Sequence, residues 1–218
     1  MDKVLSIINS CGVVSICRGV YGEDLEKLSD ALYAGGLRAI EVTFAQSDPD
    51  CIEKTSAAIA ALRARHEDMA VGAGTVLTAA QAEAAYKAGA CFIVSPNTDT
   101  SIIARTKELG MVSIPGAMTP SEIMCAYNAG ANIVKLFPAA SLGLAYLKDI
   151  RAPISHIPLM ATGGINTENF SAFLKGGCCC AGIGSYLSDK KLIAAGDWAA
   201  FERRAAEFVS IYREVAML

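Results

Sequence analysis

The chain has 218 residues, of which 53% are hydrophobic and 19% are charged, and its formal net charge is −3. This composition is typical of a globular protein with a substantial core and excludes an intrinsically disordered chain. There is no basic block that would predict nucleic-acid binding. No apolar run reaches the roughly 18–20 residues that span a bilayer, so we expect neither a nucleic-acid partner nor a membrane partner.

The N-terminal segment lacks the layout of a signal peptide, and we interpret it as mature sequence. Eight cysteines are scattered along the chain without the paired Cys-x-x-Cys spacing of a zinc site. Disulfide frameworks are typical of small, loop-rich secreted proteins, and this chain is neither small nor loop-rich. We therefore expect reduced, buried cysteines, no metal and a cytoplasmic location.

A repeated pattern runs along the chain: a helix-like stretch, one or two glycines, and then a short apolar run with turn residues on either side. A helix is expected first, at residues 2–10. Short apolar runs of this kind are typical of buried strands. Eight predicted strands follow, within residues 11–18, 34–44, 69–76, 88–96, 109–116, 129–138, 156–164 and 175–185.

The segments between these runs have the composition and the end signals of helices. Residues 49–67 and 78–89 are rich in Ala, Leu, Glu and Lys, which favour helix. Thr78 and Thr119 are expected to cap helices, the second together with Glu122 in a capping box. Glycine residues at the helix ends are expected to adopt the left-handed conformation.

Eight strand–helix units in about 200 residues predict a (β/α)8 TIM barrel with an extra N-terminal helix at its bottom. We see no linker, so residues 1–218 are expected to form a single domain. The alternative is a doubly wound open sheet. That fold would favour a Gly-x-Gly-x-x-Gly turn after the first strand, and residues 17–24, CRGVYGED, do not supply one.

Three ionisable side chains are expected to point into such a barrel. Alternate strand residues face inward, which places Lys135, Glu41 and Arg18 near one cavity at the carboxyl ends of the strands. A buried lysine must reach water, find an anion or lose its proton, and a neutral amine is a nucleophile. Alternatively, Lys135 and Glu41 form a structural ion pair, and Arg18 is simply solvated.

Glycine-rich turns close three of the predicted strands. TGG (162–164) and GIGS (182–185) end the seventh and eighth strands, where barrels commonly bind phosphate through backbone N–H groups. GAGT (72–75) ends the third strand and offers Thr75 to a second anion, such as a carboxylate. These turns predict a substrate with a phosphate group and another acidic group.

Together the motifs resemble the bacterial 2-keto-3-deoxy-6-phosphogluconate (KDPG) aldolases, a family that overlaps with the 4-hydroxy-2-oxoglutarate (KHG) aldolases. They follow the family's order and cover nearly the whole chain. The matching stretches are EVTF (41–44), VGAGTV (71–76), FIVSPN (92–97), IPGAMTPSE (114–122), KLFPA (135–139), TGGI (162–165) and GIGS (182–185).

The resemblance implies a class I aldolase on a (β/α)8 barrel that needs no metal or cofactor and forms a homotrimer. Lys135 would form a Schiff base with the substrate ketone, and Glu41 would be the general acid and base. Thr75 would help to hold the pyruvyl carboxylate. The pyruvyl pocket would be walled by Pro96 and Phe137.

The same resemblance assigns the phosphate to the two last glycine-rich turns. The substrate-binding residues implied there are Thr162, Gly163, Gly164, Gly184 and Ser185. The sequence departs from part of the family at Ala45, where some members have a substrate-binding arginine. Other members have an arginine at the end of the first strand, so Arg18 is expected to bind an anionic group of the substrate.

The expected reaction is cleavage of KDPG to pyruvate and glyceraldehyde 3-phosphate. Two alternatives keep the same lyase chemistry, on the galactonate epimer or on 4-hydroxy-2-oxoglutarate. An alternative of another class is a non-catalytic barrel that binds a sugar phosphate, which would have no use for a buried lysine and glutamate. Another phosphate-binding barrel enzyme would lack the KLFP and SPN stretches.

Overall fold

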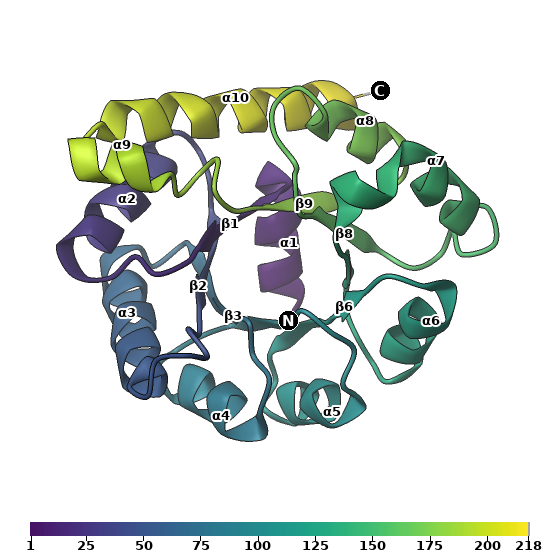
Figure 1. Cartoon of the computed structure of the whole chain (residues 1–218), viewed down its shortest axis with the longest axis horizontal. Coiled ribbons are helices and arrows are strands. Elements are labelled where there is room, and N and C mark those ends of the chain that lie inside the picture. The colour runs from purple at the N-terminus through teal and green to yellow at the C-terminus, as the bar shows by residue number, and fades with distance from the viewer. Residues whose placement is uncertain (218) are drawn as a thin grey trace.

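The computed structural model describes residues 1–217, which form a ring of parallel strands surrounded by helices (Figure 1). All strand pairs are parallel, as expected when each strand is followed by a helix. The strands are β1 (Val13–Cys17), β2 (Ala39–Thr43), β3 (Ala70–Gly74), β4 (Phe92–Val94), β5 (Val112–Ile114), β6 (Gly116–Ala117), β7 (Val134–Leu136), β8 (Leu159–Thr162) and β9 (Cys180–Ile183).

The strand order β5-β4-β3-β2-β1-β9-β8-β7-β6 describes a barrel that closes on itself. Its two ends, β5 and β6, are consecutive pieces of one predicted strand, separated only by Pro115. Proline has no backbone N–H to donate, but its carbonyl oxygen accepts from the N–H of Lys135 at 2.8 Å. The predicted eight-stranded barrel is therefore confirmed, with its fifth strand divided in two.

The helices lie outside the ring, except α1, which lies across its centre in Figure 1. The predicted cap of Thr119 is confirmed: its side chain and that of Glu122 form a capping box, and Pro120 begins the helix. Thr78 also caps as predicted. The helices are α1 (Asp2–Cys11), α2 (Gly22–Ala34), α3 (Cys51–Arg65), α4 (Ala79–Lys87), α5 (Thr100–Glu108), α6 (Pro120–Asn128), α7 (Ala139–Arg151), α8 (Phe170–Lys175), α9 (Lys190–Ala195) and α10 (Trp198–Ala216).

Two apolar cores hold these layers together. The larger core lies between the sheet and the surrounding helices and includes Val42, Val134 and Leu136. The smaller core fills the barrel interior, where Ile8 of α1 packs with residues such as Val14 and Ile133. The N-terminal helix therefore seals the amino ends of the strands, as the sequence predicts, and leaves their carboxyl ends to form a site.

Within residues 1–217, no helix combines the length and the apolar character that a bilayer crossing requires. All eight cysteines are free thiols. Burial raises the pKa of the Cys17 thiol to about 12, so it remains protonated and unreactive near neutral pH.

Candidate active site

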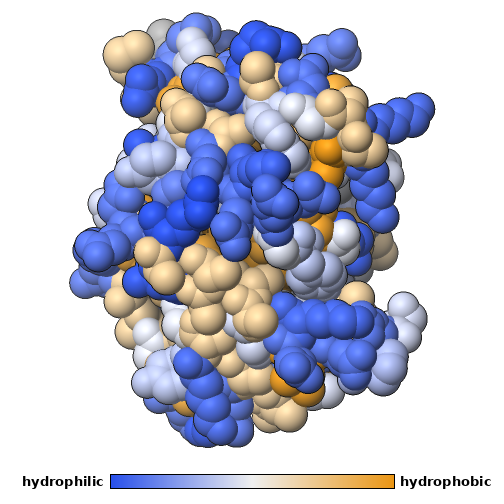
Figure 2. Space-filling view, turned by 90° about the vertical axis from the view of Figure 1, so that its left-hand side faces the viewer, coloured by the Kyte–Doolittle hydropathy of each residue, from blue (hydrophilic) through white to orange (hydrophobic). Residues whose placement is uncertain are grey.

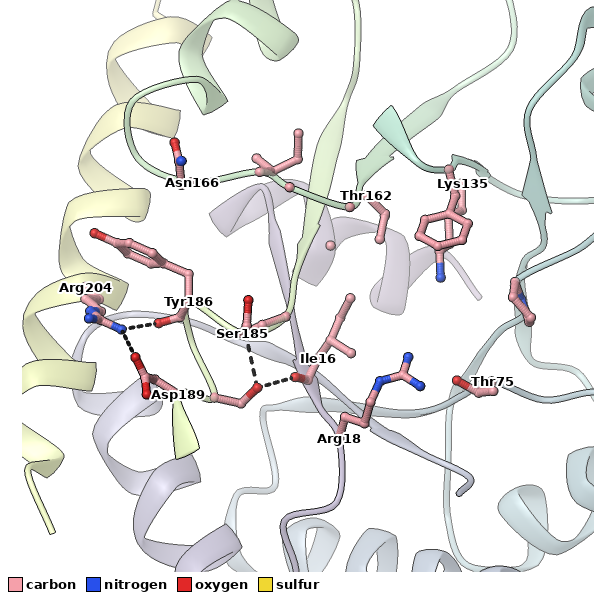
Figure 3. Close-up of a pocket in the computed structure, with 18 of the residues that line it drawn as sticks. Ile16, Arg18, Thr75, Lys135, Thr162, Asn166, Ser185, Tyr186, Asp189 and Arg204 are labelled. Atoms are coloured by element: carbon pink, nitrogen blue, oxygen red, sulfur yellow. Dashed lines mark hydrogen bonds and ion pairs between the residues drawn. The ribbon is translucent and has the colours of Figure 1, made fainter. Parts of the chain in front are cut away.

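A cavity of about 890 Å³ opens at the carboxyl ends of the strands. In Figure 3, Lys135, Arg18 and Thr75 lie toward one end of it, and Ser185 and Tyr186 lie toward the other. Of the residues predicted for the site, all except Glu41 line this cavity. They are Arg18, Thr75, Pro96, Lys135, Phe137, Thr162, Gly163, Gly164, Gly184 and Ser185.

Lys135 points into the cavity from the middle of β7. Its neighbours Val134 and Leu136 pack outward against the helices, so the alternation of the strand turns Lys135 inward. Its side chain is buried, and Nζ lies 5.0 Å from the centroid of the Phe137 ring. Within residues 1–217, no carboxylate oxygen lies within 4.0 Å of this amine. The structure therefore does not contain the tight structural ion pair between Lys135 and Glu41 that was the alternative.

Burial also changes the acidity of Lys135. Desolvation of the ammonium lowers the pKa of Lys135 below its usual value, and the positive charge of Arg18 lowers it further. The charge of Glu41 acts in the opposite direction and partly restores the pKa. Because desolvation is the largest of these effects, the net result is a larger fraction of neutral, nucleophilic amine than an exposed lysine would have.

Glu41 is enclosed by protein behind the wall of the cavity, with 1% of its surface exposed. Desolvation raises the pKa of its carboxyl group, against the opposing charges of Lys135 and Arg18. Its Oε2 atom has no hydrogen-bond partner within the part of the chain that the structure describes. An acid whose pKa is raised toward neutrality is suited to accept and return a proton.

The glycine-rich turns after β8 and β9 lie side by side at the other end of the cavity. Gly163 and Gly164 have φ angles of 94° and 74°, which residues with a side chain rarely adopt. The N–H groups of Gly164 and Ser185 donate to no acceptor among residues 1–217. Ser188 Oγ lies 3.0 Å from the carbonyl oxygen of Ile16 and fixes this turn to β1. Free N–H groups in a rigid turn form a suitable anion site.

Thr75 stands at the end of β3 with a φ of 56°, the one residue with a side chain in the left-handed region among those described. Its carbonyl oxygen accepts a hydrogen bond of 2.7 Å from Gln46 Nε2. Strained backbone of this kind is common where a side chain or N–H group is aimed at a ligand. Thr75 and Arg18 thus offer polar contacts at the end of the cavity that contains Lys135.

Residues 4–204 match the family model described as KDPG and KHG aldolase. The chain belongs to this family. Family members are aldolases, so the protein is a carbon–carbon lyase.

Several individual relatives are similar over almost their full length. A 2-dehydro-3-deoxy-phosphogluconate aldolase of Haemophilus influenzae is 34% identical, over 97% of this chain and 98% of the relative. A 2-dehydro-3-deoxy-6-phosphogalactonate aldolase of Escherichia coli is 33% identical, over 93% and 95%. The KDPG aldolase of Legionella pneumophila, solved with pyruvate captured as a covalent carbinolamine, is 29% identical. The structural match covers 93% of this chain and 96% of the Legionella pneumophila chain, with a TM-score of 0.83.

The aldolase cavity also contains residues that sequence reasoning did not identify. Asn166, Tyr186 and Arg204 line the end where the glycine-rich turns lie. Arg204 comes from α10, donates to the carbonyl oxygen of Tyr186 at 2.7 Å and lies 3.7 Å from Asp189. Its guanidinium also stacks over the Tyr186 ring. No local pattern distinguishes Arg204 from the other charged residues of an amphipathic helix, so the sequence offered no signal for it.

Proposed function

We propose that this aldolase cleaves KDPG to pyruvate and glyceraldehyde 3-phosphate through a Schiff base on Lys135. The proposal treats residues 1–218 as one barrel domain that acts in the cytoplasm on a small-molecule substrate, without metal or cofactor. The observation that supports it best is the buried amine of Lys135, which faces a large cavity and has no carboxylate within 4.0 Å among residues 1–217.

The reaction begins when the neutral amine of Lys135 attacks the C2 carbonyl carbon. Protonated Glu41 gives a proton to the resulting C2 hydroxyl group, which leaves as water, so that an iminium ion and the Glu41 carboxylate are formed. Glu41 then removes the proton of the C4 hydroxyl group. The C3–C4 bond breaks, the aldehyde leaves, and the electron pair of that bond moves into the iminium to form an enamine. Protonation of C3 by Glu41 and hydrolysis of the resulting iminium release pyruvate and restore Lys135.

The proposal assigns the two ends of the cavity to the two acidic groups of the substrate. Thr75 and Arg18 bind the pyruvyl carboxylate end, with Pro96 and Phe137 as walls. The phosphate binds the turns after β8 and β9, where the Gly164 and Ser185 N–H groups are available. Thr162, Gly163 and Gly184 complete that end of the cavity.

The galactonate epimer of KDPG is a second candidate substrate, because relatives named for the gluconate and for the galactonate compound are 34% and 33% identical to this chain. A parallel assay with KDPG, its galactonate epimer and 4-hydroxy-2-oxoglutarate distinguishes the three. We expect the highest kcat/KM with KDPG. A higher kcat/KM with either of the other two compounds would make that compound, and not KDPG, the preferred substrate.

Borohydride reduction in the presence of pyruvate tests the chemistry. We expect mass spectrometry to locate a pyruvyl-sized adduct on Lys135, and none on the Lys135→Met variant. An active enzyme without this adduct would contradict the Schiff base. Absence of both adduct and activity with all three substrates would instead favour a barrel that only binds sugar phosphates.

A homotrimer is also part of the proposal and comes from the family resemblance. A candidate contact surface is formed by α3, α4 and the segment before α4, where Ile52, Tyr86 and Leu77 are 41%, 48% and 40% exposed. Figure 2, which views the side of the barrel where these helices lie, shows a broad area of moderately hydrophobic residues. Light scattering should give three times the chain mass of 22.8 kDa. Ile52→Glu should lower this mass, and a monomeric wild-type protein would contradict the trimer.

A further inference from the structure

Three hydroxyl or carboxyl oxygens on the inward side of the barrel are buried without a protein hydrogen-bond partner among residues 1–217: Glu41 Oε2, Thr43 Oγ1 and Thr162 Oγ1. Buried polar atoms in folded proteins are nearly always hydrogen-bonded, to protein, ordered water or ligand. Glu41 and Thr162 already belong to the proposed site. Thr43 does not, and its buried hydroxyl therefore needs an explanation.

Thr43 and Glu41 lie two residues apart on β2 and share its inward face, because Val42 between them packs outward in the larger core. Thr43 is paired in register with Gly74 of β3. A Cβ atom on Gly74 would overlap the carboxyl group of Glu41 and would press against the methyl group of Thr43. The Glu41 carboxyl group therefore extends along the sheet toward Thr43, over the space that Gly74 leaves open.

This arrangement leaves two buried oxygens without a protein partner among residues 1–217, Glu41 Oε2 and Thr43 Oγ1, two residues apart on the same inward face of β2. A carboxylate only accepts hydrogen bonds, whereas a threonine hydroxyl both donates and accepts. One water molecule between them would satisfy both groups, because it can donate a hydrogen to Glu41 Oε2 and accept the hydrogen of Thr43 Oγ1. Its second hydrogen and remaining lone pair would then be available for proton exchange with a substrate.

We propose that Thr43 is a positioning residue, whose hydroxyl group holds a water molecule through which Glu41 exchanges protons with the substrate. The inference rests on the proposed function of Glu41 as acid and base. In each exchange the water accepts the substrate proton and passes one of its own to Glu41, so that it remains water. Gly74 contributes by leaving room for the carboxyl group beside this water.

Thr43→Val tests the inference, because valine keeps the shape of threonine and removes the hydroxyl group. We expect the exchange of pyruvate C3 protons in D₂O, and kcat for aldol cleavage, to fall about 10- to 100-fold. KM and the yield of the borohydride-trapped adduct on Lys135 should stay near wild-type values, because the amine is untouched. Thr43→Ser, which restores a hydroxyl group, should recover most of the exchange rate.

Thr55→Val is a matched control. The hydroxyl of Thr55 is likewise buried and without a partner among the described residues, but Thr55 lies on α3, outside the barrel, and not on the strand that carries Glu41. We expect this variant to retain wild-type exchange and cleavage. An equal loss of activity in both variants would show a general effect of removing a buried hydroxyl and would overturn the inference.

Wild-type exchange in Thr43→Val, with Lys135 still trapped, would overturn the role of Thr43 and leave the proposed function intact. A wild-type protein that forms no Lys135 adduct would overturn both. If Thr43→Val does not fold, as judged by circular dichroism, Thr43→Cys provides the same comparison, because a thiol is only a weak donor. Undiminished exchange in that variant would also contradict the inference.

Discussion

The two ends of the barrel are both buried, but they are built from different chemistry. At the amino ends of the strands, Ile8 of α1 and its neighbours form a core of apolar side chains. At the carboxyl ends, Glu41 and Lys135 are also almost inaccessible, with exposures of 1% and 7%. Burying ionisable groups opposes folding unless they are well paired. The apolar core at the amino ends of the strands therefore stabilises the fold. Part of this stabilisation offsets the free-energy cost of burying the ionisable groups at the carboxyl ends.

The largest effect should come from Lys135→Met. Methionine is apolar and of similar length, so we expect a folded protein in which aldol cleavage falls by at least about 10⁴-fold, because the nucleophile is lost. Steady-state kinetics measures the rate, and circular dichroism confirms the fold. Substantial remaining activity would show that the amine at the top of the barrel is not the reactive group.

Glu41→Gln should have the next largest effect. The amide keeps the size of the carboxyl group but cannot take up a proton, so we expect both cleavage and pyruvate C3 proton exchange to fall about 10²–10⁴-fold. Wild-type proton exchange in this variant would exclude Glu41 as the base. The Lys135 adduct should still form, which separates the two roles.

At the other end of the cavity, Ser185→Ala keeps the backbone N–H group and removes the side-chain hydroxyl, which we expect to donate a further hydrogen bond to the phosphate. The variant should therefore bind the phosphate more weakly and leave the chemistry intact. Loss of one hydrogen bond to a charged group costs about 1.5–3 kcal/mol, so we expect KM for KDPG to rise about 10- to 100-fold. The same variant should show unchanged kinetics with 4-hydroxy-2-oxoglutarate, which has no phosphate. An equal change with both substrates would argue against a phosphate contact.

The pH dependence of adduct formation on Lys135 tests the effect of the charges around its amine. The positive charge of Arg18 lowers the pKa of Lys135, and the negative charge of Glu41 raises it. Arg18→Met should therefore move the midpoint of adduct formation, trapped with cyanoborohydride, to higher pH, and Glu41→Gln should move it to lower pH. The wild-type midpoint should lie below 10.5, the value of a free lysine. Shifts in the same direction for both variants would contradict this electrostatic arrangement.

The smallest effect on catalysis should come from the bottom of the barrel. Ile8→Ala leaves a cavity in the smaller core, so we expect a loss of about 2–5 kcal/mol in the free energy of unfolding. Denaturant titration measures this loss. The kcat of the folded fraction should stay near the wild-type value, and a large fall in kcat at full folding would show that the two ends are coupled.

Much of the fold could be predicted because its signals are local. The alternation of helix-forming segments, glycines and short apolar runs predicted the strands and the order of the helices. The two-residue period of β7 predicted that Lys135 faces inward, since its neighbours are apolar. The capping box at Thr119 and Glu122 likewise depends on residues close in sequence.

Other features depend on segments that are distant in sequence. The barrel closes because β6, which follows β5 directly after Pro115, pairs with β7 at the other end of the strand order. The inclusion of Arg204 in the cavity wall depends on how α10 packs against the barrel. The enclosure of Glu41 behind that wall depends on the neighbouring strand, where Gly74 has no side chain.

The amino-acid sequence by itself determined the order of the elements, the inward direction of Lys135 and Glu41, and the glycine-rich turns. These properties follow from backbone preferences and from the periods of strands and helices, which act over a few residues. Only the tertiary structure decided how acidic these groups are and which oxygens lack a partner. Acidity and hydrogen bonding depend on desolvation and on charges contributed by other strands, and these exist only when the barrel is closed.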